Sequence, residues 1–352
     1  MARIVGCDVG TGFFQTAEEI NGQIELKCVR NAFIELVKTD DIHEMLRQNK
    51  FQWVEDDTNV YVIGEDAIRF ARMLPGKVEL RRPLQDGVLN AGEEKKMLVL
   101  NELIRSTVGK AADKKSVVAT CVSSPPIDGS SNNTFHERRL RGMFENQGWT
   151  CQIIEEALAV ILAERPTIIE ADGTEVPYSG IGISFGAGRV NALLAYKGIT
   201  VVGMSASRSG DYIDNEVANA ITVPVSQVTN YKETKLDFDN IDMDNDLAFA
   251  LDAYYTKTIS DVFEMFASKF QSVKSDFERP LDIVVAGGTS MPKGFIKKLD
   301  GIVRGLKVPF QIKEVRHSKD PRNSVVKGLL ARATITAREL AKKDSPEEIL
   351  KS

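Results

Sequence analysis

The feature that most constrains the fold of this chain is a short pattern that occurs twice, near the start and near the middle. IVGCDVGTGFFQTA begins at Ile4, and GIGISFGAGRVNAL begins at Gly180. Superimposing the two stretches pairs three glycines of the first with three of the second, namely Gly6, Gly10 and Gly12 with Gly182, Gly186 and Gly188. Each stretch is typical of two strands joined by a glycine-bearing turn. The chain contains either two halves that begin alike or two unrelated hairpins that both need glycine.

The sequence around the repeat predicts a mixed α/β protein. Short apolar runs rich in β-branched residues predict strands in five segments: 3–10, 13–20, 23–29, 116–124 and 281–288. Apolar residues at helical spacing predict helices in four segments: 92–109, 134–147, 155–164 (before a break at Pro166) and 246–274. Helices and strands therefore alternate along the chain, which indicates the α/β class.

Length and charge narrow the function classes. A chain of 352 residues favours two domains. The net charge of −5 gives no electrostatic reason to expect nucleic acid or an anionic membrane as partner. No apolar run reaches the roughly 20 residues of a membrane span, and the N-terminus lacks a signal-peptide core. We expect a cytoplasmic protein, with its four separated cysteines as buried thiols in a reducing compartment.

The glycine turns suit phosphate binding. Without a Cβ, the backbone N–H groups of a tight turn can approach an anion closely. Asp8 precedes the first turn, where a carboxylate can hold hydrated Mg²⁺. The alternative is that Asp8 only caps its own turn.

Three segments in order resemble the actin-like ATPase superfamily of actin, Hsp70 and sugar kinases, and within it the bacterial actins MreB and MamK. CDVGTGFF is similar to the first phosphate loop, GISFGAGRVNALLAYKG to the second, and DIVVAGGTSMPKGF to the adenosine loop. The resemblance extends to MLPGKVELRRPLQDGVLNAGEEKKML, which crosses the first domain, to HERRLRGMF and to DPRNSVVKGLLARA.

The resemblance implies a duplicated, ribonuclease H-like two-domain fold with ATP held in a cleft between the domains. Domain I would comprise 1–148 and 320–352, with a subdomain at about 32–71. Domain II would comprise 149–319, with a subdomain at about 208–276.

The resemblance also implies site residues. The phosphates and Mg²⁺ would be bound by Asp8, Gly10, Thr11, Gly12, Phe13, Gly186, Ala187, Gly188 and Arg189. The adenosine would be bound by Gly210, Lys232, Glu233, Gly287, Gly288, Thr289 and Met291. Glu137 would orient the attacking water as general base, with Asp8 as the catalytic metal ligand.

Each assignment outside the turns has a plainer alternative. Glu137 can be a surface residue paired with Arg141, and Lys232 with Glu233 a solvated helix pair. Asp211, which follows Gly210, can be an ordinary helix N-cap. We do not assign a catalytic role to His136, because the family uses no histidine there.

The second phosphate loop departs from the family pattern. Ser184 stands where the family has an aspartate, Arg189 and Val190 replace two small hydroxyl residues, and Asn191 replaces an acidic residue. Because phosphoryl transfer depends on positioning and charge neutralisation, we expect slow hydrolysis, which Ser184→Asp would accelerate. Arg189 either stabilises the γ-phosphate or forms a salt bridge elsewhere.

We therefore expect a filament-forming protein in which ATP binding favours assembly and slow hydrolysis favours disassembly. A nucleotide-binding scaffold without turnover and a small-molecule kinase of the same fold are the alternatives. The expected partner is a second copy of the chain, and the resemblance leaves room for an unidentified cytoskeletal adaptor. We expect no nucleic-acid partner and no direct membrane binding.

Overall fold

The chain divides into two compact units. The computed structural model describes residues 2–73, 78–89, 94–130, 133–164, 167–169, 173–273, 277 and 279–343. Unit 1 comprises Met1–Cys121, Asn133–Ile153 and Leu329–Ser352, and unit 2 comprises Val122–Asn132 and Ile154–Gly328. The predicted break at Pro166, the first residues of the predicted helix 92–109 and the segment after Lys343 lie outside the described residues.

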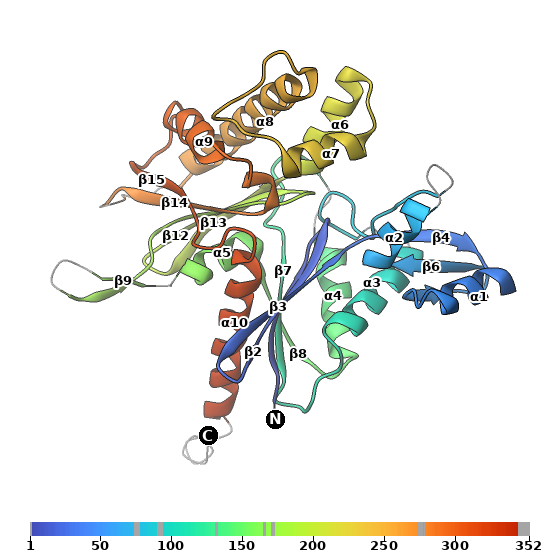
Figure 1. Cartoon of the computed structure of the whole chain (residues 1–352). Coiled ribbons are helices and arrows are strands. Elements are labelled where there is room, and N and C mark those ends of the chain that lie inside the picture. The colour runs from blue at the N-terminus through green and yellow to red at the C-terminus, as the bar shows by residue number, and fades with distance from the viewer. Residues whose placement is uncertain are drawn as a thin grey trace. The chain divides into compact units, whose positions relative to one another are not determined.

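Unit 1 is built on a five-stranded sheet with the order β3-β2-β1-β7-β8. Its strands are β1 (Ile4–Val9), β2 (Phe13–Ile20), β3 (Gln23–Arg30), β7 (Val117–Val122) and β8 (Thr150–Glu155). β1 pairs antiparallel with β2 and parallel with β7. Figure 1 shows α3 (Glu94–Thr107) and α4 (Thr134–Glu145) on one side of this sheet and the C-terminal part of α10 (Ser324–Lys343) on the other.

A small domain follows β3 within unit 1. It contains β4 (Phe33–Val37), α1 (Asp40–Gln48), β5 (Trp53–Glu55), β6 (Asn59–Ile63) and α2 (Glu65–Met73). Its strands form a separate sheet with the order β4-β6-β5. Apolar side chains from the sheet and both helices form its own core, among them Ile34, Leu46, Val62 and Phe70. The segment between β3 and α3 therefore folds around a core that the main sheet does not supply.

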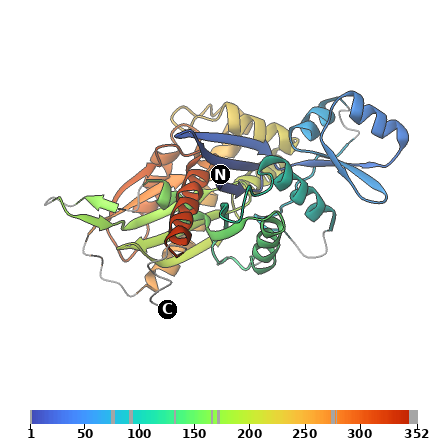
Figure 2. The ribbon, with the colours of Figure 1, turned by 90° about the horizontal axis from the view of Figure 1, so that it is seen from below.

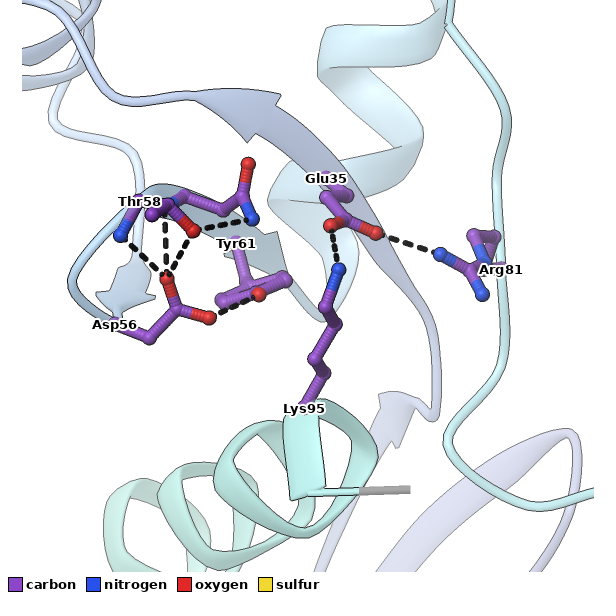
Figure 3. A network of polar contacts seen from close by, with 7 residues as sticks. Glu35, Asp56, Thr58, Tyr61, Arg81 and Lys95 are labelled. Atoms are coloured by element: carbon purple, nitrogen blue, oxygen red, sulfur yellow. Dashed lines mark hydrogen bonds and ion pairs between the residues drawn. The ribbon is translucent and has the colours of Figure 1, made fainter. Parts of the chain in front are cut away.

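Two polar clusters fix this small domain (Figure 3). Glu35 on β4 accepts a hydrogen bond from Arg81 (2.6 Å) and pairs with Lys95 at the start of α3. Asp56 closes the turn between β5 and β6 by accepting from the backbone N–H of Thr58 (2.8 Å) and from the Tyr61 hydroxyl (2.5 Å). These hydrogen bonds, the Tyr61 bond foremost, lower the pKa of Asp56 to about 2.

Unit 2 repeats the same sheet plan with the order β13-β12-β11-β14-β15. Its strands are β11 (Gly180–Phe185), β12 (Val190–Tyr196), β13 (Ile199–Ala206), β14 (Leu281–Ala286) and β15 (Ile312–His317). Its helices are α5 (Glu156–Glu164), α6 (Gly210–Ile221), α7 (Val225–Thr234), α8 (Asp246–Gln271) and α9 (Phe295–Arg304). A short hairpin of β9 (Thr167–Ile169) and β10 (Glu175–Pro177) extends from it (Figure 2).

The two sheets are copies of one arrangement, so the two-halves interpretation of the repeat is confirmed. A shift of 176 residues, from Ile4 to Gly180, moves the bounds of β1 and β3 onto those of β11 and β13. The strand register follows the same shift, because Val5 pairs with Glu18 and Ile181 pairs with Leu194. This observation bears out the predicted α/β class and the predicted duplication.

One expectation about the cysteines is wrong. Cys7, Cys121 and Cys151 are buried free thiols, as predicted, but Cys28 is exposed. Cys28 lies on β3, which is an edge strand of the unit 1 sheet and is largely solvent-exposed. The apolar character of QIELKCV therefore reflects β-propensity rather than burial.

Candidate functional site: two glycine turns and the residues that support them

The first turn connects β1 to β2 in unit 1. A Cβ on Gly10 would lie 2.8 Å from the backbone oxygen of Phe13, closer than real Cβ contacts occur, so the turn requires glycine there. Thr11 is buried, and the Phe13 ring lies under the guanidinium of Arg30 at 4.1 Å. The predicted residues Asp8, Gly10, Thr11, Gly12 and Phe13 are thus gathered in one short stretch of unit 1.

Asn31 supports this turn and was missed by the sequence reasoning. Its side-chain Nδ2 donates to the Gly10 carbonyl (2.8 Å), and its backbone N–H donates to the Gly12 carbonyl (3.1 Å). The side chain is completely buried. Asn31 lies in a stretch without a recognised family counterpart, and the only signal was an asparagine directly after a strand, a residue that favours turns.

Asp8 is a half-buried carboxylate directly beside the first turn. Burial raises its pKa to about 6, because loss of water penalises the charged form, while the hydrogen bond from the Cys121 thiol (3.6 Å) lowers it. A cation bound at this carboxylate would offset the burial penalty. One carboxylate beside backbone N–H groups suits Mg²⁺, which keeps several waters and takes its other ligands from phosphate.

The second turn, in unit 2, repeats the constraint of the first. A Cβ on Gly186 would lie 2.9 Å from the backbone oxygen of Arg189. The Gly186 carbonyl accepts hydrogen bonds from the hydroxyls of Ser209 (2.5 Å) and Thr289 (2.8 Å) and, at 3.3 Å, from the N–H of Gly210. Three segments that are distant in sequence therefore meet at one carbonyl oxygen: the second glycine turn, the turn before α6 and the turn after β14.

Lys232 is not part of a solvated helix pair. Its side chain is 9% exposed and its ammonium group lies 2.7 Å from a carboxylate oxygen of buried Asp214. It also donates to the Gly210 carbonyl (3.1 Å), whereas Glu233 is exposed. Burial raises the pKa of Asp214, and the Lys232 charge opposes that rise. This places Lys232 against the backbone of the turn before α6, a position from which it can support the turn.

The α6 N-terminus also differs from one alternative considered from the sequence. The helix begins at Gly210 with Ser209 as N-cap, so Asp211 is not the cap. The Asp211 N–H instead donates to the Ala187 carbonyl at 2.8 Å. The turn before α6 is thereby attached directly to the second glycine turn.

The turn after β14, which the sequence predicts to bind adenosine, combines one constrained glycine with one open glycine. Gly287 has φ of +97°, and a Cβ there would lie 2.3 Å from the Phe185 carbonyl oxygen. A Cβ on Gly288 would meet no heavy atom within 4 Å. Thr289 is buried, its carbonyl accepts from the Tyr255 hydroxyl (3.1 Å), and Met291 follows half-buried. Open space at Gly288 fits a group that lies against the backbone.

The expected loss of a carboxylate at the second turn needs correction. Ser184 donates its hydroxyl to Glu156 Oε1 at 2.5 Å, and Asn191 Nδ2 donates to Glu156 Oε2 at 2.9 Å. A carboxylate is therefore present, supplied by the first residue of α5. The sequence reasoning missed Glu156 because it treated the loop as a continuous segment, and α5 lies before it in the chain.

Arg189 lies inside unit 2. Its side chain is 2% exposed, and Nη1 donates to the Ser205 hydroxyl at 3.2 Å. Its backbone oxygen accepts from the Gly186 N–H and closes the turn. The backbone of Arg189 therefore shapes the second turn, while its guanidinium is committed to the protein interior.

Comparison with known proteins assigns the chain to a family. A sequence profile of the volactin family matches residues 3–333. The chain belongs to the volactin family. No curated protein matches it by sequence.

Solved structures show that this volactin-family chain has the fold of bacterial actins. A MamK double helical filament superimposes with a TM-score of 0.71 at 18% identity, covering 95% of this chain and 99% of that chain. MreB5 of Spiroplasma citri gives TM-scores of 0.63 bound to ADP and 0.65 bound to AMPPNP, at 15% identity. Each of these covers 97% of this chain and 99% of the MreB5 chain. The predicted resemblance to MreB and MamK is confirmed at the level of the fold.

Glu137 lies on α4 of this volactin-family chain and makes the plainer contact weighed from the sequence. Its carboxylate lies 3.4 Å from Arg141, with both side chains about 40% exposed (43% and 40%). Such an exposed pair contributes little to stability, typically about 0–1 kcal/mol. The neighbouring His136 is buried and accepts from the Leu89 N–H (3.3 Å), consistent with a structural role.

No helix among the described residues of this volactin-family chain is both long and apolar enough to cross a membrane.

Proposed function

We propose that this volactin-family chain binds Mg-ATP and assembles into filaments, with ATP binding favouring assembly and slow hydrolysis favouring disassembly. The observation that carries the proposal is the duplicated glycine turn, which in both halves brings the backbone too close for any Cβ. Such close turns present N–H groups to an anion, and a pair of them suits a polyphosphate. The fold likeness to MreB5 bound to ADP and AMPPNP supports the same choice of ligand.

The proposed binding residues are divided between the two units. In unit 1, the backbone of Gly10, Thr11 and Gly12 would bind phosphate, and Asp8 would hold hydrated Mg²⁺. In unit 2, phosphate would be bound by Gly186, Ala187 and Gly188, and adenosine by Gly287, Gly288, Thr289 and Met291. Lys232 would support Gly210 from behind, in line with its buried contacts. Glu233, which is exposed, would contact the nucleoside.

Hydrolysis would rest on positioning and charge neutralisation. When bound, Mg-ATP supplies the phosphoanhydride bond and a cation that neutralises developing charge. Glu137 would accept the proton of the attacking water. Its ion pair with Arg141 is exposed and long at 3.4 Å, so redirecting the carboxylate costs little. We propose that the chain is a slow ATPase on this basis.

Filament formation is supported by the fold likeness to a MamK double helical filament. A filament arises when a head-to-tail contact repeats without closing, so assembly depends on protein concentration. The proposed partner is a second copy of the chain in the cytoplasm, with any cytoskeletal adaptor still to be identified.

Sedimentation and electron microscopy test this proposal. Protein at tens of micromolar is compared with Mg-ATP, with Mg-ADP and without nucleotide, and phosphate release is followed in parallel. We expect filaments that pellet with Mg-ATP and slow phosphate release. A monodisperse monomer with Mg-ATP would contradict assembly, and filaments without phosphate release would favour a non-hydrolysing scaffold.

Gly288→Leu separates ligand binding from folding. Open space at this position lets the fold accept a side chain, while the leucine would occupy the adenosine site. The matched control is Gly301→Leu on α9, where a Cβ also meets no atom within 4 Å. We expect Gly288→Leu to lose ATP binding and assembly at an unchanged Tm, and Gly301→Leu to keep both. ATP binding by Gly288→Leu at the parent affinity would refute the adenosine assignment.

A further inference from the structure

We propose that the edge strand β3 is a contact surface for a second copy of this chain, and that the two β3 strands pair antiparallel about a two-fold axis at Leu26. Such a contact closes on itself, because each copy uses the same surface. It therefore differs from the head-to-tail contact that extends a filament, and it does not require nucleotide.

The outer edge of β3 carries free backbone groups. The Asn31 N–H donates to the Gly12 carbonyl (3.1 Å), a bond that continues the β2–β3 register. Because the hydrogen-bonding direction alternates along a strand, odd-numbered positions of β3 face β2. Ile24, Leu26 and Cys28 therefore direct their N–H and C=O groups away from the sheet. Among the described residues no hydrogen bond reaches these groups, so the edge is a template for another strand.

The length of the open edge fixes the register of pairing. At its C-terminal end, the outward N–H of Arg30 already donates to the Glu65 carboxylate (3.1 Å). The open outward positions are thus Ile24, Leu26 and Cys28, with Leu26 in the middle. A two-fold pairing that uses all three places Leu26 opposite its own copy and Ile24 opposite Cys28. Each such pair exchanges two N–H···O bonds.

The charges on β3 select the same register. With Leu26 at the two-fold axis, Glu25 lies opposite Lys27 of the second copy, and Lys27 lies opposite its Glu25. Both side chains are exposed, and they occupy the positions where facing side chains approach most closely. A shift of two residues in either direction would instead place Glu25 opposite Glu25 or Lys27 opposite Lys27, which is repulsive.

Apolar side chains on the other face of β3 add to the contact. Ile24 is 50% exposed and Leu26 is 40% exposed, and both project from the face opposite Glu25 and Lys27. Pairing brings these two side chains together with those of the second copy and removes part of their surface from water. β3 contains no proline and pairs with β2 without a bulge, so it lacks two common devices that block edge pairing.

The equivalent edge strand of unit 2 has both a cover and a bulge. Ser205 on β13 donates its N–H to the Pro125 carbonyl (2.9 Å) and accepts from the Ile127 N–H (3.0 Å). A register shift also interrupts the pairing of β12 with β13 at Leu194/Ala195. Both features oppose strand addition. Among the described residues, β3 has neither, so the two duplicated halves differ at this edge.

Three charge variants of the full chain test the proposal: Glu25→Lys, Lys27→Glu and the double variant Glu25→Lys/Lys27→Glu. Sedimentation velocity measures self-association without nucleotide, in EDTA and at low salt. Asp57→Lys, at an exposed position in the turn between β5 and β6, is the control with the same change of charge as Glu25→Lys. The Tm of each variant reports whether it folds as the parent does.

We expect the parent and Asp57→Lys to form dimers. Each single variant on β3 should dimerise at least about ten-fold more weakly, because like charges then face each other at two places in the dimer. The double variant should regain the parent affinity, since it only exchanges the two charges. An equimolar mixture of Glu25→Lys and Lys27→Glu should form a heterodimer, in which two lysines of one chain face two glutamates of the other. About 1 M salt should reduce the differences.

A parent that stays monomeric at tens of micromolar would overturn the proposal. If that monomer still forms filaments with Mg-ATP, the inference about β3 fails while the proposed function stands. Dimers that persist in both single variants would show that the contact lies elsewhere. Failure of the mixture to form a heterodimer, with both variants melting as the parent does, would refute the register centred on Leu26.

Discussion

The two glycine turns have the same backbone constraint but different side-chain support. A Cβ would meet a backbone oxygen at 2.8 Å in the first turn and at 2.9 Å in the second. Among the described residues, the Gly10 carbonyl accepts one side-chain hydrogen bond, from Asn31, whereas the Gly186 carbonyl accepts two, from Ser209 and Thr289. The strand before the first turn carries its own carboxylate, whereas the strand before the second holds one that comes from α5.

This difference distinguishes a constraint set by the backbone of the turn from supporting contacts that side chains of other elements can provide. Replacing the glycine is costly, because the clash involves backbone atoms that a side-chain rotation does not relieve. A carboxylate or a hydrogen-bond donor can come from any element that reaches the turn. Duplicated halves can therefore keep their turns while diverging around them.

The largest effect is expected at Asp8. Asp8→Asn should remove most of the Mg²⁺-dependent affinity for ATP, by about a hundred-fold or about 2.7 kcal/mol, because the strand carboxylate is lost outright. Asp57→Asn, at an exposed turn position in the same unit, is the charge-matched control and should behave as the parent. Calorimetric titration with Mg-ATP measures both, and unchanged affinity in Asp8→Asn would contradict its role.

Substituting the turn glycine by alanine should destabilise both halves by a similar amount. Gly10→Ala and Gly186→Ala should each lower the free energy of unfolding by about 1–3 kcal/mol, the cost of inserting a methyl group into filled space. Gly142→Ala, in α4 where a Cβ meets nothing within 4 Å, should be neutral or stabilising by up to about 1 kcal/mol. Denaturant unfolding measures all three. A large effect in one turn and none in the other would break the equivalence.

Removing the supporting hydrogen bonds should destabilise the two turns by different amounts. Asn31→Ala removes the only side-chain donor to Gly10 among the described residues, and should cost about 1–3 kcal/mol. Thr289→Ala should cost less, because Ser209 still donates to Gly186. The double variant Ser209→Ala/Thr289→Ala should then lose more than the sum of the two single variants, because it leaves the Gly186 carbonyl only the long contact from the Gly210 N–H at 3.3 Å among the described residues. Strict additivity in unfolding measurements would show that the two donors act independently.

The smallest expected effect is on the stability of unit 1 at acidic pH. The folded pKa of Asp56, about 2, lies below the ordinary value of about 3.9. Its ionised form therefore stabilises the fold above about pH 4, and this stabilisation disappears as the pH falls from about 4 to 2. Tyr61→Phe removes the bond that contributes most, so its Tm deficit relative to the parent should shrink over that range.

Tyr196→Phe in unit 2 is the control for this pH dependence. The Tyr196 hydroxyl is buried without a hydrogen-bond partner among the described residues. The Tm difference between Tyr196→Phe and the parent should be the same at pH 6 and pH 3. A Tyr61→Phe deficit that is equally independent of pH would contradict the assigned role of Asp56.

The repeat could be predicted from the sequence because glycine positions record backbone constraints directly. The spacing of Gly6, Gly10 and Gly12 reappears unchanged in the second half, and the strands follow it. The order of the three family-like segments then indicated the fold class, which the structures of MamK and MreB5 confirm. The nine predicted strand and helix segments agree with the structure to within a few residues, because apolar spacing and β-branched content reflect which residues are buried in each element.

The supporting residues could not be predicted, because nothing local marks them. Asp214 and Lys232 lie on two different helices, and only their packing brings the charges together. Glu155 and Glu156 are adjacent in sequence, yet Glu155 bonds to Ser124 and Glu156 to Ser184. Which of two neighbouring carboxylates reaches the turn depends on where α5 begins, and the sequence does not fix that boundary.

Calorimetric titration of ATP into the unsubstituted chain, with Mg²⁺ and again with EDTA, tests the central claim most directly. The claim is that two glycine turns, each with one carboxylate, bind a polyphosphate together with a divalent cation. The account predicts saturable binding of one ATP per chain with Mg²⁺ and clearly weaker binding in EDTA. Equal affinity in both conditions, or no saturable binding in either, would contradict it.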